Sequence, residues 1–262
     1  MKSLLLALLI MLGSINCYSQ ELSDKIPIAF GGKTYGYMVR VPGGSFTMGS
    51  NDGESDEKPP HSVSVSTFYI GETEVTQELW KDVMGDNPSD FKKGDNYPVE
   101  NVSWNDCQTF IKKLNEKTGK NFRLPTEAEW EFAARGGKSG GTKYSGSDNL
   151  AEVAWYGWWD DNDKNRTITT QTTLPVAQKN PNSLGIYDMS GNVWEWCNDW
   201  YAFDYYKNSP SNNPQGPSSG SYRVLRGGSW GHGAIDCRVA FRSCYIPAFR
   251  NSIIGLRLAL VP

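Results

Sequence analysis

The 262-residue sequence contains only two histidines, His61 and His232, and its cysteines form no Cys-x-x-Cys pair. This scarcity disfavours a structural zinc site and leaves almost no ligands for an iron site built on two or three histidines. The net charge is −3 and no basic tract occurs. Because phosphate contacts require clustered lysines and arginines, we expect no nucleic-acid partner and no membrane-surface patch.

Long apolar runs are also missing after the first residues. Met1-Lys2-Ser3 precedes an apolar run from Leu4 to Leu12, and a polar stretch follows as far as Gln20. A single positive charge, a short apolar run and a polar exit are typical of a secretory signal peptide. The run is well short of the ~20 residues that span a bilayer, so we expect no transmembrane segment.

We therefore predict that residues 1–20 are a signal peptide and that residues 21–262 form a single exported domain, periplasmic or extracellular. A lipid anchor on Cys17 is the less favoured alternative, because Ser14-Ile15-Asn16 is a poor approach to a lipidated cysteine.

Aromatic residues and glycines are abundant, with 10 Trp and 27 Gly. This composition suits a loop-rich domain stabilised by aromatic clusters. Helix signals fall in the first half of the chain, where Ser103 with Asp106 and Thr126 with Glu129 have the spacing of capping boxes. We predict helices from Thr76 to near Gly85, from Ser103 to Gly119 and from Thr126 to Gly136, and strands at Tyr37–Val41, Phe46–Met48 and Val63–Ile70.

Few helices followed by a turn-rich second half predict an α+β domain with short strands and much irregular structure. Several sequence blocks identify the domain further. In chain order they are Val41 to Gly49, Glu74-Val75-Thr76, Pro98 to Trp104, Arg123 to Glu131, Gly191 to Trp196, Arg226 to Trp230 and Gly255-Leu256-Arg257.

In this order the blocks resemble those of the formylglycine-generating enzyme (sulfatase-modifying factor) family, a variant of the C-type lectin fold. They cover nearly the whole mature chain. In the sulfatase-activating members, two cysteines that follow the Gly-Gly-Ser-aromatic block hold copper and oxidise a substrate cysteine with oxygen. That chemistry requires two thiolates within reach of each other.

The segment after Trp230 lacks this cysteine pair. His232 stands where the first catalytic cysteine would be, nothing replaces the second, and Cys237 comes several residues too late. We therefore expect no copper and assign no catalytic residue, and the sequence leaves open whether the protein is an enzyme.

The resemblance implies a structural calcium ion instead. The family positions correspond to Asp188, Gly191, Val193 and Glu195, which would offer two carboxylates and two backbone carbonyls. Hard oxygen donors of this kind suit calcium. The alternative is that Asp188 caps a turn and Glu195 pairs with an arginine.

Cys197 and Cys237 have two explanations. One is metal or redox chemistry, and the other is a disulfide that joins the Trp-Glu-Trp-Cys loop to the C-terminal loop. Export favours the disulfide, which we predict.

Trp194 and Ser229 match positions that line the family's active site, and we place Trp230 and His232 in the same pocket. Core packing for Trp194 and a backbone hydrogen bond for Ser229 explain these residues equally well. Our functional hypothesis is a non-catalytic module that binds a protein, peptide or glycan through the loops around Trp194 and Gly231–Asp236. The alternative is a sulfatase-modifying-type oxidoreductase that acts on a protein cysteine or another substrate in the same pocket.

A second alternative comes from the residues between Trp230 and Ile254. A framework of fixed letters is interleaved with positions that contain no Lys, Glu, Gln, Met or Trp. This pattern resembles the variable segment of lectin-fold proteins diversified by retroelements, whose adenine mutagenesis yields a restricted residue set. An undiversified binding loop explains the same letters. The framework letters are Cys237-Arg238, Ala240, Arg242, Pro247 and Arg250.

Overall fold

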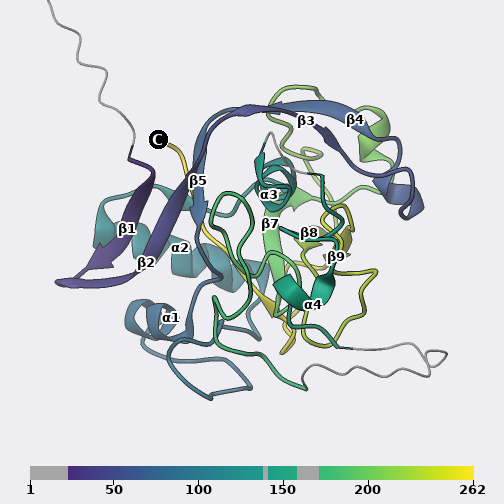
Figure 1. Ribbon diagram of the computed structural model, residues 1–262. Coiled ribbons are helices and arrows are strands. Elements are labelled where there is room, and N and C mark those ends of the chain that lie inside the picture. Colours follow the sequence, from purple (N-terminus) through teal and green to yellow (C-terminus); the bar gives the residue numbers. More distant parts are fainter. Residues whose placement is uncertain (1–22, 138–140, 158–170) are drawn as a thin grey trace, which may run out of the picture.

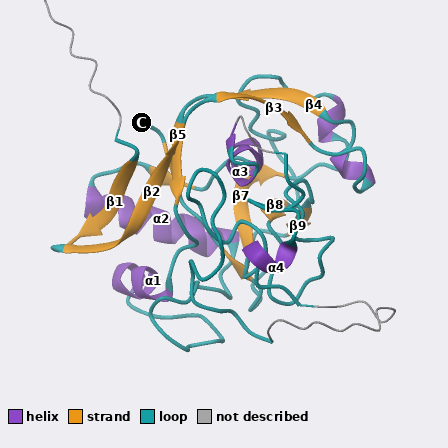
Figure 2. Cartoon of the chain, viewed as in Figure 1, coloured by secondary structure: helices purple, strands orange, loops and turns teal. Residues whose placement is uncertain are grey.

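The computed structural model describes residues 23–137, 141–157 and 171–262 (Figure 1). The predicted signal peptide and Cys17 lie outside these ranges. Within them, no helix is long and apolar enough to cross a membrane. Short helices, short strands and long connecting loops make up the fold (Figure 2), which confirms the predicted α+β class.

The elements follow one another with little regular structure in the second half. The strands are β1 Lys25–Phe30, β2 Lys33–Val41, β3 Gly44–Met48, β4 His61–Val65, β5 Phe68–Gly71, β6 Phe122–Arg123, β7 Trp194–Trp200, β8 Arg223–Arg226, β9 Ser243–Tyr245, β10 Ile254–Gly255 and β11 Ala259–Leu260. The α-helices are α1 Gln77–Met84, α2 Trp104–Thr118, α3 Glu127–Ala134 and α4 Leu150–Val153, with 3₁₀ turns at Ser55–Glu57 and Tyr205–Lys207.

The described strands form three sheets. One has the order β1-β2-β5-β11-β6, the second has the order β10-β7-β8-β9, and β3 pairs with β4 in a separate ribbon. Strand β11 lies antiparallel between β5 and β6, with Ala259 opposite both Ile70 and Arg123. Strand β10 runs parallel to β7, with Ile254 opposite Trp194. The last strands of the chain therefore enter both larger sheets.

The predicted strand Val63–Ile70 is divided in the structure into β4 and β5, which belong to different sheets. The chain bends at Ser66, whose backbone N–H donates to Asn213 Oδ1 at 2.7 Å. At the neighbouring bend between β2 and β3, the Gly43 N–H donates to Thr67 Oγ1 at 3.0 Å. A Cβ at Gly43 would lie 2.7 Å from the Thr67 nitrogen, so the two bends pack too closely for a side chain.

The three predicted helices begin where their caps indicate, and the first two also end there, whereas α3 ends at Ala134 with Arg135 as its C-cap, just before the predicted Gly136. Thr76, Ser103 and Thr126 are the N-caps of α1, α2 and α3, and the last two form capping boxes. Gly85 and Gly119 end α1 and α2 in the left-handed conformation, with φ of 90° and 66°. Each cap satisfies backbone groups that the helix itself leaves unpaired.

Two large clusters of buried side chains form the core. One lies around α1 and α2, where Trp80 stacks on Phe110 with ring centroids 4.8 Å apart. The other lies around α3, which packs against β3, β4 and β7. Trp130 and Trp196 are fully buried, and Trp196 Nε1 donates to the Val102 carbonyl at 3.0 Å. The aromatic clusters expected from the composition are thus present.

Candidate functional site

The C-terminal segment, defined here as residues 231–253, joins Trp230 to β10 and is held in place by arginines. Arg238 forms two hydrogen bonds to Glu57, at 2.9 and 2.6 Å. Arg242 does the same with Glu127, at 2.7 and 2.9 Å. Bidentate pairs of this kind fix both distance and orientation. Although burial opposes ionisation, Arg242 and Arg226 hold the pKa of Glu127 below its ordinary value.

A third framework arginine attaches the segment to the start of α2. Arg250 bonds both oxygens of Asp106 at 2.6 and 2.7 Å. Asp106 also accepts from the Ser103 N–H in the capping box. The Asp106 carboxylate thus caps the N-terminus of α2 and also anchors the C-terminal segment.

Several large side chains outside the framework positions face outward. Ile235, Tyr245 and Ile246 are 59%, 42% and 47% exposed, and Tyr245 stacks on Phe249 with ring centroids 3.9 Å apart. Other non-framework side chains do not face outward, since Val239 is buried and Phe241, Phe249 and Ile253 pack against the core cluster around α1 and α2. The framework residues Cys237, Ala240 and Arg242 are buried by contrast.

Three of the four predicted pocket residues meet around one histidine ring. His232 Nδ1 lies 2.7 Å from Ser229 Oγ and 3.2 Å from Trp194 Nε1. Because an indole N–H only donates, Nδ1 must be the acceptor, which places the proton of the neutral ring on Nε2. Burial lowers the pKa of His232, and the charge of Asp236 opposes that shift. The ring is therefore a neutral acceptor in this cluster.

Ser229 is fully buried, so its hydroxyl group is not placed as an accessible nucleophile. Trp230, the fourth predicted residue, packs against residues outside this cluster. Its Nε1 donates to the Ser252 carbonyl at 3.0 Å, and the edge of Phe91 lies against it at 5.3 Å between ring centroids. Packing and hydrogen bonding within the domain account for the positions of all four predicted pocket residues. That these residues bind a ligand remains a prediction.

The predicted calcium residues surround a buried group of three carboxylates. Glu195 pairs with Arg257, whose Nη2 lies 2.7 Å from Oε1, and accepts from Trp130 Nε1 at 2.6 Å. Glu74 is the second carboxylate of this group, and it accepts a hydrogen bond from the Val193 N–H at 3.1 Å. Asp188 accepts from the Ala177 N–H through Oδ2, while its buried Oδ1 has no hydrogen-bond partner.

The charge in this group is unbalanced, because Glu74, Asp188 and Glu195 face the single guanidinium of Arg257. Burial, together with the charges of Asp188 and Glu195, raises the pKa of Glu74 well above its ordinary value. Burial likewise raises the pKa of Asp188 to about 6.

In the described part of the chain, no three His, Cys, Asp or Glu side chains converge as a metal site. A calcium ion held here would need backbone carbonyls as well, as the family pattern expects at Gly191 and Val193. The unpartnered Asp188 oxygen and the excess negative charge fit such an ion. Glu195 also pairs with an arginine, as the alternative interpretation expected.

The sequence assigned no role to Glu74, although it belongs to the Glu74-Val75-Thr76 block. The available signal was a carboxylate two residues before the N-cap of a helix. Its approach to Asp188 depends on contacts between residues 72–74 and residues 187–193, which sequence spacing does not specify.

The predicted disulfide between Cys197 and Cys237 is not formed, since both are free, buried thiols. Cys197 packs in the core cluster around α3, whereas Cys237 belongs to a small separate cluster with Tyr144 and Leu150. Burial raises the pKa of each thiol. The two cysteines thus serve as small apolar residues in different parts of the core.

Comparison with known proteins agrees with this architecture. The family model for the sulfatase-modifying factor enzyme 1-like domain matches residues 29–261. Among curated proteins, the chaperone protein LppX of Paenibacillus barcinonensis is 39% identical over 236 residues, covering 74% of this chain and 78% of LppX. The formylglycine-generating enzyme of Streptomyces coelicolor is 34% identical over 289 residues, covering 85% of this chain and 88% of the enzyme.

Two solved structures are also similar. Treponema denticola variable protein 1 has a TM-score of 0.82 and 36% identity, covering 92% of this chain and 100% of that one. PvdO from Pseudomonas aeruginosa has a TM-score of 0.73 and 29% identity, covering 87% and 95%. The chain belongs to the sulfatase-modifying factor enzyme 1-like domain family and has its variant of the C-type lectin fold.

Proposed function

We propose that the protein is an exported, non-catalytic binding module whose C-terminal segment contacts a protein partner. The observation that carries this proposal is that some residues of the segment anchor it to the domain while others are exposed to solvent. Arg238, Arg242 and Arg250 attach it to the domain, while three of its large side chains, Ile235, Tyr245 and Ile246, are exposed. A backbone that is already fixed loses little further conformational entropy on binding.

The exposed residues favour a protein as the ligand. Ile235, Tyr245 and Ile246 are all large, apolar and more than two-fifths exposed. Tyrosine is enriched at the centres of protein interfaces, and clustered apolar side chains on a surface mark interaction sites. Cys237 and Cys244, the two cysteines of the segment, both come later than the positions of the copper-binding pair, and burial raises the pKa of both thiols.

Retroelement diversification is a second candidate that the burial pattern favours. The framework letters are the anchored or buried positions, and most positions with the restricted residue set are at least partly exposed. The similar Treponema denticola protein is itself named a variable protein. Substitution at the outward positions would change the binding surface without disturbing the anchors.

Two experiments test these proposals. A sulfatase peptide incubated with the protein, copper and oxygen is expected to keep its cysteine, and formylglycine in its mass spectrum would overturn the non-catalytic assignment. For diversification, the coding segment for Trp230–Ile254 is sequenced from many independent isolates. Variation at the exposed positions with an invariant framework is expected, and an invariant segment would exclude diversification.

The protein contact itself is tested with a display library randomised at Ile235, Tyr245, Ile246 and Ala248 and selected against a single folded protein. Binders that retain the three anchoring arginines are expected. A matched library randomised at four exposed positions of β1 and β2 is the control. If both libraries yield binders equally often, the segment has no special binding capacity.

A further inference from the structure

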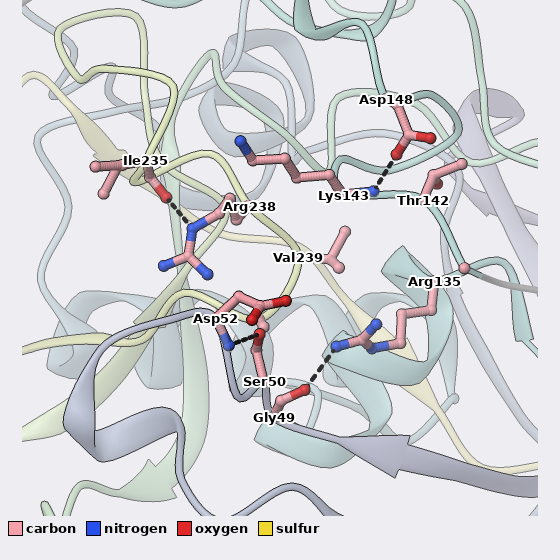
Figure 3. Close-up of a pocket in the computed structure, with 12 residues that line it drawn as sticks. Gly49, Ser50, Asp52, Arg135, Thr142, Lys143, Asp148, Ile235, Arg238 and Val239 are labelled. Atoms are coloured by element: carbon pink, nitrogen blue, oxygen red, sulfur yellow. Dashed lines mark hydrogen bonds between the residues drawn. The ribbon is translucent and has the colours of Figure 1, made fainter.

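A second feature of the C-terminal segment is a cavity that its residues 235–240 help to line. The cavity has a volume of about 520 Å³ (Figure 3). Its wall comes from four parts of the chain that are distant in sequence: residues 49–52 after β3, Arg135 after α3, residues 141–148, and residues 235–240 of the segment. Such a volume lies within the range of small-molecule sites.

The cavity wall has two arginines whose head groups are fixed from behind. Arg135 donates to Glu131 through Nε at 2.9 Å and to the Gly49 carbonyl through Nη2 at 3.1 Å. Arg238 is held by its pair of bonds to Glu57. Glu57 and Glu131 are fully buried, so a ligand would meet the guanidinium groups and not these carboxylates. Such groups are preorganised, because their orientation is fixed before a ligand arrives.

Lys143 supplies a third cation, and its side chain extends toward Ile235 and Arg238 in Figure 3. Within the described ranges it makes no ion pair, and its ammonium lies 5.4 Å from the ring centroid of Tyr144. Its backbone is fixed, since its N–H donates to Asp148 Oδ1 at 2.7 Å and its carbonyl accepts from the Val239 N–H at 3.0 Å. An ammonium without a carboxylate partner on an otherwise fixed residue is available to an anionic ligand group.

Acceptors for hydrogen bonds complete the wall. Asp52 and Asp148 are exposed carboxylates, and Ser50 and Thr142 add hydroxyl groups. A simple inorganic anion would use the cations but would meet unfavourable charge from these two carboxylates. A ligand with one carboxylate and several hydroxyl groups would satisfy both kinds of group, because its hydroxyls donate to the aspartates.

We propose that this cavity binds a polyhydroxylated carboxylate of the sugar-acid class, with Lys143 pairing with the ligand carboxylate. The apolar side chains of Ile235, Val239 and Ala240 would cover the less polar face of the sugar ring. This site shares Ile235 with the outward-facing partner surface, but its three cationic side chains are not among the exposed apolar residues of that surface. Charge-assisted hydrogen bonds from the lysine and from fixed guanidiniums supply most of the specificity.

The test uses glucuronate as the probe, in titration calorimetry on the full mature chain at low salt. Binding with a millimolar or lower Kd is expected, with a loss of about tenfold in Lys143→Met and little change in Lys143→Arg. Lys92→Met removes an exposed lysine that is not part of the cavity wall, and is the matched control. Unchanged melting temperatures would show that the variants fold.

Each other outcome counts against the proposal. No glucuronate binding by the wild-type protein, or equal binding of glucose, would overturn the assigned ligand class. Binding that Lys143→Met leaves unaltered would place the probe elsewhere on the molecule. Binding of glutamate without glucuronate would replace the sugar acid by an amino acid. None of these results bears on the partner surface, whose exposed side chains are left intact in all three variants.

Discussion

At the scale of single residues, buried arginines organise the molecule. Arg226, Arg242 and Arg257 are almost completely buried, and each bonds a carboxylate from a distant part of the chain. Taking an ion out of water costs several kcal/mol unless a well-placed partner offsets that cost. The sequence identified these arginines as framework or motif letters, but it did not identify their partners. Each pairing joins residues 62 or more positions apart, which no local pattern encodes.

Removing one of these arginines should strongly destabilise the fold. In Arg242→Met, Glu127 stays buried and keeps the more distant Arg226, whose Nε lies 3.7 Å from Oε1, and a 3.4 Å hydrogen bond from the Tyr206 hydroxyl group. We expect the free energy of unfolding in urea to fall by about 3–5 kcal/mol. Arg250→Met removes a similar bidentate pair whose arginine is 53% exposed. It should cost no more than about 1 kcal/mol, and equal losses in the two variants would contradict this explanation.

Glu100 should make stability depend on pH. It is fully buried, its Oε2 has no partner, and burial raises its pKa to about 7. The folded state therefore keeps this proton over a pH range in which the unfolded chain has lost it. The contribution of Glu100 to stability is largest below pH ~4.5 and is lost as the pH rises to about 7.

Glu100→Gln removes this titration while an amide oxygen can still accept from the Phe91 N–H, a bond of 2.8 Å in the wild type. We expect the stability of the variant relative to the wild type to be more favourable at pH 8 than at pH 5. Urea unfolding at the two pH values measures the difference. A difference that does not change with pH would show that Glu100 ionises normally.

At the scale of elements, local signals located the helices well and the strands less well. Caps are local, so Thr76, Ser103 and Thr126 marked helix starts without any knowledge of the fold. The apolar alternation of Val63–Ile70 indicated an extended chain correctly. It could not reveal the bend at Ser66, because that bend depends on Asn213, which comes from a loop far along the chain.

The cap of α1 offers a clean test at this scale. Thr76 Oγ1 accepts from the Leu79 N–H at 3.3 Å. Thr76→Ala should lower the free energy of unfolding by about 1 kcal/mol, since it leaves that N–H without its partner. Thr76→Ser keeps the hydroxyl group and should lose less than half as much. If chemical denaturation gives the two variants the same stability, the hydroxyl group does not stabilise the helix.

At the scale of the whole molecule, the order of the motifs along the chain was sufficient to identify the fold and family. The candidate sites were less predictable. Asp188, Val193 and Glu195 do surround one buried region, but Glu74 completes it from the other end of the chain. The expected disulfide is not formed, because Cys197 and Cys237 lie in different clusters of the core. The number of cysteines and the cellular compartment do not predict which cysteines lie close together.

The proposed calcium ion should be visible in global stability. An ion that binds only the folded state raises the melting temperature as its concentration rises. We expect EDTA to lower the melting temperature and calcium to restore it in the wild type. Asp188→Asn removes one of the excess buried charges and should abolish the response. Asp86→Asn, at an exposed position, should retain it, and a wild-type melting temperature insensitive to EDTA would exclude a structural calcium ion.

The position of β11 has a consequence for how the protein is made. This strand, at residues 259–260, lies between β5 and β6, so a sheet that begins with the first described strand is completed by residues that are synthesised after the C-terminal segment. A nascent chain cannot close that sheet until the whole C-terminal segment has emerged from the ribosome. A premature stop or frameshift in the coding region of the segment would therefore produce an incomplete fold open to proteolysis, and not a folded domain with an altered surface. Only chains whose reading frame is intact through the binding segment can therefore complete this sheet and fold.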